Sequence, residues 1–171
     1  PPPASTSPAV LHERFPTPPE RLGEILLRRG DLTPDELDML LEAQRARPRP
    51  LGVLAEEMLG LSPAVVEEAW AEQFAGFTAT INPLLERVDP HILASVSTRQ
   101  AWQFRLIPLR RQGHEVMVCT IQRQLPRALR FAYRHFGPEC WIVLCDEHAL
   151  YAALQRHYPM NISREEWLRY P

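Results

Sequence analysis

The pattern of hydrophobic and polar positions divides the chain into four segments. Residues 1–20 have no periodic apolar positions and are rich in proline, so we expect a linker there. In residues 21–76, apolar side chains recur at helical spacing in short amphipathic segments. In residues 77–158, strand-like apolar runs alternate with helical segments, and residues 159–171 form a tail or linker. We therefore predict an α+β fold with an N-terminal lobe of tandem short helices followed by a small α/β lobe.

Four helices are predicted in the first lobe, arranged as two pairs. In the first pair one helix ends near Gly30, and the next begins after Thr33, which precedes a proline and two acids as an N-cap residue does. In the second pair one helix opens at Leu51-Gly52, and the next at Ser62-Pro63. The second helix of each pair has an apolar face that ends in glutamine: Leu37, Leu40, Leu41 and Gln44 in the first, and Val66, Ala69, Trp70 and Gln73 in the second.

The two pairs of helices form an internal repeat with a period of 29 residues. When residues 21–44 are placed on residues 50–73, identical residues fall at helix openings, turns and helix ends. Because these matches coincide with the starts, turns and ends of the predicted helices, they indicate a repeated supersecondary unit. The identical pairs are Leu22/Leu51, Gly23/Gly52, Leu32/Leu61, Pro34/Pro63 and Gln44/Gln73.

The second lobe is predicted to mix short strands with helices. The strands are expected at Thr78–Ile81, Leu106–Arg110, Glu115–Ile121 and Trp141–Leu144, with a turn at Gln112-Gly113. The helices are expected from Asp89-Pro90 through about Phe104, at Pro126–Phe136 and at Glu147–His157. Residues Ile162–Leu168 form either one more helical turn or linker.

The amino-acid composition limits the reactions and ligands that can be expected of this chain. The chain has 171 residues and 45% apolar content, which is enough for a core, and all 19 of its basic residues are arginine. Without lysine it has no P-loop lysine and no amine for a Schiff base. A net charge of −2 argues against a nucleic-acid polymer as partner, whereas arginine's planar fork suits phosphate and guanine edges. A small anionic ligand is the better expectation.

Enzymatic and metal chemistry have little support in the sequence. No nucleophile–base pair is recognisable. Cys140, Cys145 and His148 are candidate metal ligands, but the sequence has no closed set of four ligands with the usual spacing. Three cysteines without a secreted framework favour a reducing compartment. No apolar stretch reaches the ~18 residues of a membrane span, and the first residue is proline, so we expect a segment of a longer chain. The arginines of residues 123–134 suit either a solvated face or an acidic partner.

The opening of the first repeat resembles the MshEN motif. The run Arg21-Leu22-Gly23-x-x-Leu26-Leu27-x-x-Gly30-x-Leu32, continued by Leu37, Leu41 and Gln44, matches its 24 positions except at Asp31. In that family two motifs follow each other across a five-residue spacer, which here would be Arg45–Arg49. The resemblance covers about residues 20–158 and implies a non-catalytic regulatory domain without a metal.

The resemblance implies a site for cyclic di-GMP. Physically, a glycine at a helix opening lets a phosphate approach free backbone N–H groups, apolar side chains can support a purine face, and a glutamine can bond a base edge. Two copies suit a ligand with two equivalent halves. The expected ligand-binding residues are Arg21, Leu22, Gly23, Leu26, Leu37, Leu41, Gln44, Arg49, Pro50, Leu51, Gly52, Val66, Trp70 and Gln73.

The second motif departs further from the family pattern. Pro50 stands where an arginine is expected, Ala55-Glu56 replaces an aliphatic pair, and Leu59 occupies the internal glycine position. One hypothesis is that Arg49 or Arg47 replaces the missing arginine. The alternative for all these positions is structural, with leucines in a core, glycines at helix boundaries and glutamines at solvated helix ends.

Two functions follow from the resemblance. In the first, cyclic di-GMP binding controls a host domain in the same chain, either a type II secretion or type IV pilus ATPase or a membrane glycosyltransferase that makes exopolysaccharide. In the second, the domain no longer binds nucleotide and serves as a protein-docking module of a secretion ATPase, gripping an inner-membrane assembly protein. Both imply a bacterial, cytoplasmic location at the inner-membrane face through the host protein.

Overall fold

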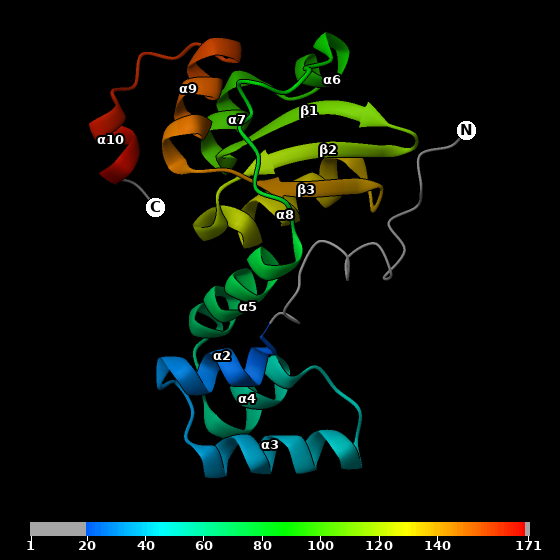
Figure 1. Cartoon of the computed structure of the whole chain (residues 1–171), viewed down its shortest axis with the longest axis vertical. Coiled ribbons are helices and arrows are strands. Elements are labelled where there is room, and N and C mark those ends of the chain that lie inside the picture. The colour runs from blue at the N-terminus through cyan, green and yellow to red at the C-terminus, as the bar shows by residue number, and fades with distance from the viewer. Residues whose placement is uncertain (1–19, 170–171) are drawn as a thin grey trace. The chain divides into compact units, whose positions relative to one another are not determined.

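The computed structural model describes residues 20–169, which form two compact units that divide between Phe77 and Thr78 (Figure 1). The helical unit consists of α2 (Leu22–Arg29), α3 (Pro34–Ala46), α4 (Leu51–Leu59) and α5 (Pro63–Phe77). The α/β unit has a sheet of β1 (Leu106–Gln112), β2 (Glu115–Thr120) and β3 (Cys140–Leu144). Its helices are α6 (Pro90–Ala94), α7 (Thr98–Phe104), the short 3₁₀ helix η1 (Gln122–Gln124), α8 (Leu125–Phe136), α9 (Glu147–His157) and α10 (Arg164–Arg169). The predicted α+β class is confirmed.

Local signals set the helix ends in the helical unit. Gly30 and Gly60 end α2 and α4 with φ of 80° and 71°, a left-handed conformation that glycine adopts without strain. Since α2 has 8 residues and α4 has 9, the second terminal glycine falls one position later in its repeat. The cap predicted for α3 is present: the Glu36 N–H donates to Thr33 Oγ1 at 3.3 Å, and the Glu36 carboxylate accepts from the Thr33 N–H at 2.8 Å.

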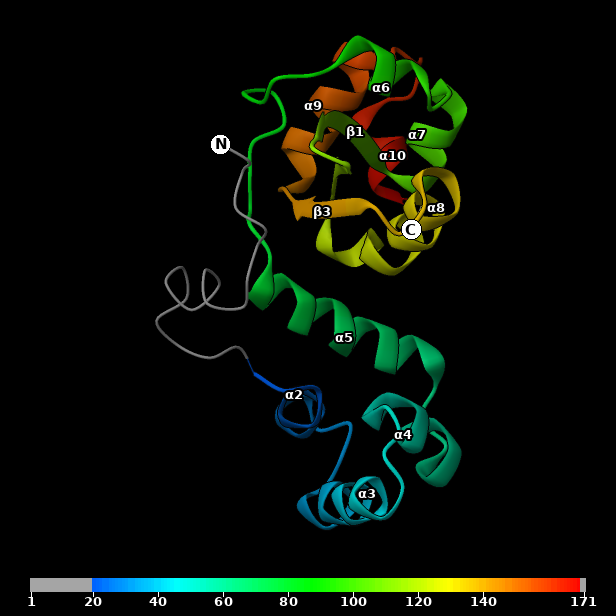
Figure 2. The same ribbon diagram turned by 90° about the vertical axis from the view of Figure 1, so that its right-hand side faces the viewer.

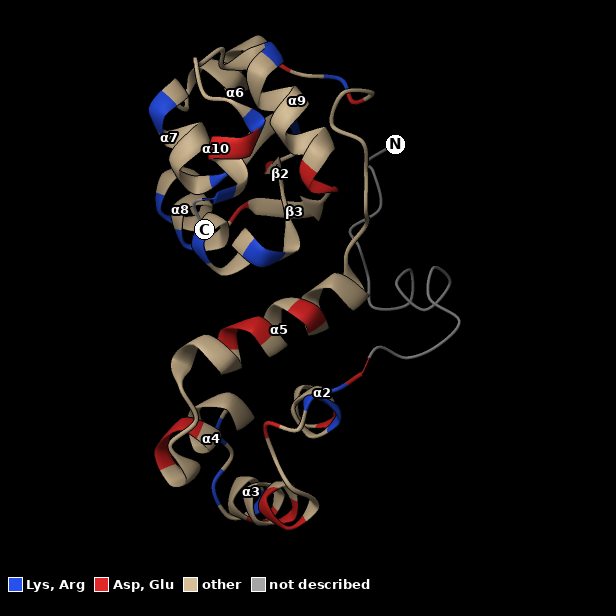
Figure 3. Ribbon diagram, turned by 90° about the vertical axis from the view of Figure 1, so that its left-hand side faces the viewer, with Lys and Arg blue, Asp and Glu red and all other residues tan. Residues whose placement is uncertain are grey.

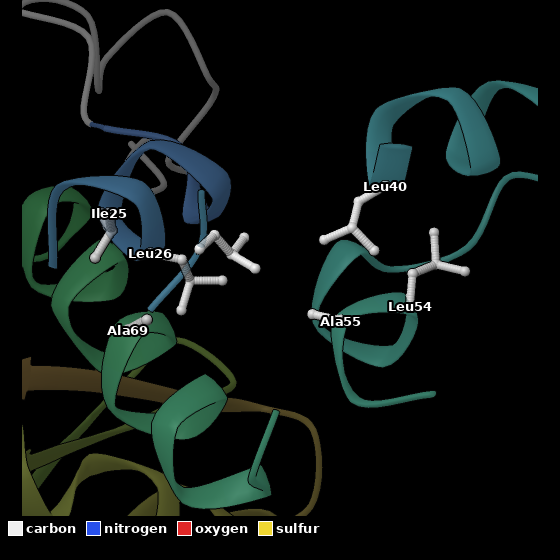
Figure 4. Packing of buried hydrophobic residues seen from close by; sticks show 7 residues of the cluster. Ile25, Leu26, Leu40, Leu54, Ala55 and Ala69 are labelled. Carbon is white, nitrogen blue, oxygen red and sulfur yellow. The ribbon is translucent and has the colours of Figure 1, made fainter. Parts of the chain in front are cut away.

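The core of the helical unit uses equivalent positions of both repeats (Figure 4). Leu26 and Leu40 are fully buried, and 29 residues later their counterparts are the buried alanines Ala55 and Ala69. Burying a leucine side chain contributes about 1.5–3 kcal/mol. The first repeat therefore supplies most of the side-chain volume of the buried cluster. The whole cluster comprises Ile25, Leu26, Leu32, Leu40, Leu54, Ala55 and Ala69.

The sheet of the α/β unit has strand order β1-β2-β3. The strands β1 and β2 form an antiparallel hairpin that turns at Gly113, with an irregular register between Pro108 and Arg110. The pair β2 and β3 is parallel, which requires a crossover, and η1 with α8 provides it. Helix α8 packs against β2 and β3, while α6, α7 and α9 pack against β1 (Figure 2).

The strand predicted at Thr78–Ile81 is only an isolated bridge. Thr80 pairs with Leu144, and the Ile81 N–H donates to the Leu144 carbonyl at 2.8 Å. The pairing ends because the chain turns at Asn82, whose side chain accepts from the Leu84 N–H at 3.0 Å, and because Pro83 has no N–H to donate.

The prediction of a single helix from Asp89 through about Phe104 is wrong, because the structure has two helices there, α6 and α7. Ser97 begins α7 with a capping box: the Gln100 N–H donates to Ser97 Oγ at 3.3 Å, and the Gln100 side-chain oxygen accepts from the Ser97 N–H at 3.0 Å. These side-chain bonds satisfy backbone groups that a continuous helix would use. The break therefore has a local cause.

Of the two alternatives for Ile162–Leu168, the helical one is present as α10. Its Trp167 is buried, and the Tyr151 hydroxyl donates to the Ile162 carbonyl at 2.8 Å. In the described part of the chain, no helix combines the length and apolar character needed to cross a membrane.

Candidate functional site

The two Leu-Gly openings of the repeats pack against each other in the helical unit. A Cβ placed on Gly23 would lie 3.0 Å from Leu51 Cδ2, and a Cβ placed on Gly52 would lie 3.5 Å from Leu22 Cδ2. Each glycine thus receives the leucine that opens the other repeat. The N-termini of α2 and α4 are therefore neighbours in a reciprocal, approximately two-fold arrangement.

Each glycine also contacts the second helix of its own repeat. A Cβ on Gly23 would lie 2.6 Å from Leu37 Cδ1, and one on Gly52 would lie 2.6 Å from Val66 Cγ1. Leu37 and Val66 occupy equivalent repeat positions. Neither glycine has a positive φ, so close packing, rather than an unusual backbone conformation, accounts for glycine at these positions.

The two glutamines join the repeats through the backbone. The Gln44 side-chain amide donates to the Arg49 carbonyl at 2.7 Å, and the Gln73 side-chain amide donates to the Glu20 carbonyl at 3.4 Å. Glu20 and Arg49 are themselves 29 residues apart, each two residues before a Leu-Gly opening. Each glutamine therefore holds the chain just before the opening of the other repeat.

Ion pairs with exchanged charges occupy equivalent positions of the repeats. In the first repeat, Arg28 donates to both carboxylate oxygens of Glu20, at 3.1 and 2.9 Å. In the second, Arg49 donates to both oxygens of Glu57, at 2.6 and 2.7 Å. Each arginine lowers the pKa of its carboxyl partner. Because Arg49 is bound to Glu57, it can replace the arginine missing at position 50 only by leaving this pair.

The N-termini of α2 and α4 differ from those of several other helices in the chain. Thr33, Asp89, Ser97 and Asp146 each accept a backbone N–H at the start of their helices. Pro50 makes no such bond to α4, whose first turn contains no acid.

At α2 the N-cap residue is the exposed Arg21, whose N–H donates to the Glu24 carboxylate at 2.7 Å. The N–H groups of a helix's first turn have no intrahelical partner and lie at the positive end of the helix dipole. The paired openings therefore bring two positive helix ends together, with one carboxylate, Glu24, in the first turn of α2 and none in that of α4.

The remaining predicted site residues differ in how far their side chains are buried. Leu26 is fully buried in the core, whereas Leu41 and its repeat counterpart Trp70 are partly exposed. The Trp70 and Phe74 ring centroids are 5.6 Å apart. The residues that the structure brings together at the paired openings are Leu22, Gly23, Leu37, Leu51, Gly52 and Val66.

The ion pairs beside this site were not predicted, although the sequence contains a signal for them. Extending the repeat by one residue upstream aligns Glu20 with Arg49, and the same shift aligns Arg28 with Glu57. Opposite charges at both positions, eight residues apart within each repeat, would have predicted two pairs of reversed polarity.

Cys119 and Cys140 are not poised as nucleophiles. A hydrogen bond with Cys145 and burial raise the pKa of Cys119, and burial raises the pKa of Cys140 to about 11. These thiols therefore stay protonated near neutral pH. Within residues 20–169, no three histidine, cysteine or acidic side chains gather as metal ligands would.

Comparisons with known proteins place the chain in a family. The model described as MshEN domain matches residues 77–164, which is 88 of the 171 residues. This match covers the α/β unit up to the first residue of α10, and the tandem repeat precedes it. No curated protein is similar enough to count as a relative.

Two solved structures are similar at low identity. A structure of MshE with cdg is 21% identical, with a TM-score of 0.46, and the match covers 81% of this chain and 99% of that one. The N-terminal domain of XpsE is 18% identical, with a TM-score of 0.44, covering 81% of this chain and 94% of that one. Since both TM-scores are below 0.5, the assignment depends on the family model, whose match to more than half of the residues shows that the chain belongs to the MshEN domain family.

Proposed function

We propose that this chain is a non-catalytic regulatory domain that binds cyclic di-GMP at the paired openings of α2 and α4. The observation that carries the proposal is their reciprocal packing, through Gly23 with Leu51 and Gly52 with Leu22. Two helix N-termini then lie side by side, and at neither does the N-cap side chain accept a backbone N–H, so their first-turn N–H groups, which have no intrahelical partner, can face a ligand. Cyclic di-GMP has two phosphates and two guanines in equivalent halves, so a repeated site matches its symmetry.

The predicted residues then have distinct roles. Arg21 provides a bidentate contact to one phosphate, because its guanidinium is exposed at the start of α2. Leu41 and Trp70, partly exposed at equivalent positions, offer apolar surface to the bases. Each glutamine keeps one amide hydrogen and its oxygen for a base edge while it donates to the backbone. Leu26 acts through the core beneath the site.

The two halves of the site are unequal in this proposal. The α2 half has Arg21, whereas the α4 half has Pro50 and must hold its phosphate through N–H groups and the helix dipole. A charge-assisted hydrogen bond contributes about 1.5–3 kcal/mol. Loss of Arg21 should therefore weaken binding by roughly 10- to 100-fold, since each 1.4 kcal/mol is about a factor of ten.

Calorimetric titration of cyclic di-GMP tests the proposal. We expect saturable heat with one ligand per chain, a loss of roughly 10- to 100-fold in affinity for Arg21→Ala, and an unchanged affinity for Arg45→Ala. Arg45 is the control because it is exposed in the last turn of α3. Absence of heat at tens of micromolar ligand would sink the proposal.

The proposed function includes a host domain in the same protein. Membership in the MshEN family supports a secretion or pilus ATPase in the same protein, at the cytoplasmic face of the inner membrane, with an exopolysaccharide glycosyltransferase as the other host. Sequencing beyond this segment discriminates them: a downstream GxxxxGK[ST] run indicates the ATPase, whereas upstream membrane spans indicate the glycosyltransferase.

A second candidate function is protein docking without a nucleotide. Pro50 and the Arg49–Glu57 pair favour it, because they leave the second half of the site without an available guanidinium. This function predicts a flat titration together with capture of an inner-membrane assembly protein in a pull-down. Saturable ligand binding that depends on Arg21 would count against it.

A further inference from the structure

A second site is suggested by a cavity within the α/β unit. It has a volume of about 400 Å³ and lies among α7, the start of α8, the loop before α10, and α10 itself. This volume falls in the range of small-molecule pockets. Its main lining residues are the apolar Trp102, Ile162 and Trp167 and the charged Arg105, Arg127 and Glu166.

Arg105 is the most unusual residue of this cavity. Its exposed fraction is 4%, which is rare for arginine. Its Nη2 donates to the Trp167 carbonyl at 2.5 Å, but its Nη1 is buried and has no hydrogen-bond acceptor among residues 20–169. The Glu147 carboxylate lies 3.8 Å from Nη1. A buried guanidinium is thus left with an incomplete set of partners.

The backbone at Arg105 is strained. Its φ of 49° and ψ of 55° are left-handed, and in the described part of the chain no other non-glycine residue has a positive φ. Such a conformation is often found where a functional side chain must be held in place. Here it ends α7 and places the guanidinium 4.6 Å from the centroid of the Trp167 ring.

The charge around the cavity is positive. Burial, followed by the charges of Arg123 and Arg127, lowers the pKa of Arg105 to about 10. Glu147 also pairs with Arg123, and Glu166 accepts from the N–H and hydroxyl of Ser163 at 2.9 and 3.1 Å. The wall therefore has two arginines and one carboxylate, a surplus of one positive charge.

The wider sequence has the same imbalance. Residues 90–138 contain eight arginines and a single acid, Glu115, although the whole chain has a net charge of −2. Figure 3 shows the arginines of α7 and α8 in blue on helices without acidic residues. An anion would find a favourable potential at this end of the α/β unit.

We propose that this cavity binds a small organic anion with one carboxylate on a flat apolar body. Arg105 and Arg127 would hold the carboxylate, and a single negative charge matches the surplus on the wall. The rings of Trp102 and Trp167 would contact the flat body. The Trp167 indole N–H is buried and has no hydrogen-bond acceptor among the described residues.

The test is a titration of 2-naphthoate into the chain, followed through the indole N–H signals in a ¹⁵N–¹H spectrum. We expect the Trp102 and Trp167 signals to shift saturably at roughly millimolar concentration, with at least about fivefold weaker binding for Arg127→Gln. Arg134→Gln, an exposed residue of the same helix, should bind as the parent does. The neutral 2-naphthamide and ring-free acetate should not shift these signals.

Several outcomes would overturn this inference. They are no shift at about 10 mM 2-naphthoate, an equal shift with 2-naphthamide, or equal binding by Arg127→Gln. Tighter binding of 2-naphthyl phosphate by about tenfold would refute the single-charge carboxylate. Arg105→Lys is expected to abolish binding, and because a buried substitution can unfold the unit, Arg127→Gln decides the matter. The result is independent of cyclic di-GMP binding in the helical unit.

Discussion

At the residue scale, the two opening glycines are closely packed whether or not a ligand is present. Leu37 and Val66 lie 2.6 Å from the positions where Cβ atoms would be. These neighbours differ in flexibility, because a leucine can turn its terminal methyls away, whereas a β-branched valine is restricted at χ1. Equivalent positions in the two repeats should therefore tolerate alanine unequally.

Gly52→Ala should lower the free energy of unfolding by about 1–3 kcal/mol, and Gly23→Ala should cost less. Urea unfolding measures both, with Val53→Ala as a control that alters the exposed side of the same helix. In a Val66→Ala background, Gly52→Ala should cost clearly less, since the clashing methyl is removed. Equal costs in both backgrounds would show that this contact is not the cause.

His157 gives the α/β unit a pH dependence. Burial and the charge of Arg156 lower its pKa below the usual 6.5. As pH falls through this range, the unfolded chain takes up the proton first, so stability present above about pH 6.5 is lost toward acid. His157→Gln should therefore lose less stability than the parent between about pH 7.5 and 5.5, as measured by urea midpoints. A variant with the parent's full acid loss would contradict the assignment.

At the element scale, predictability depended on whether the deciding interaction is local. The cap at Thr33 and the glycine ends of α2 and α4 follow from neighbouring residues, and they were predictable. The break at Ser97 was also local, because Ser97 and Gln100 have capping-box spacing, but the helical pattern across it obscured the signal. The extent of pairing at Thr78–Ile81 depends on the distant Leu144, so sequence alone could not limit it.

Ser97→Ala should remove the cap of α7 and lower the free energy of unfolding by about 1 kcal/mol. The substitution leaves the Gln100 N–H without its acceptor and lets the break between α6 and α7 relax. Arg99→Ala, at an exposed position of α7, is the matched control and should stay within about 0.5 kcal/mol of the parent. Similar values for the two variants would mean that the capping box does not fix this boundary.

At the scale of the whole molecule, the α+β order was predictable because the repeat and the strand-helix alternation are properties of the linear sequence. The repeat was recognised in the sequence, but neither the reciprocal packing of the Leu-Gly openings nor the reversed ion pairs were predicted. The cavity of the α/β unit could not have been predicted. Its Trp102, Arg127 and Trp167 come from three helices with no common spacing.

We propose that α2 and α4 hold equivalent halves of one cyclic di-GMP, and a ¹⁵N–¹H titration of the chain with cyclic di-GMP measures this arrangement at both helices. The amide signals of residues 22–24 and 51–53 are expected to shift along one saturation curve that ends at one ligand per chain. Shifts confined to one helix opening, or none at either, would contradict it.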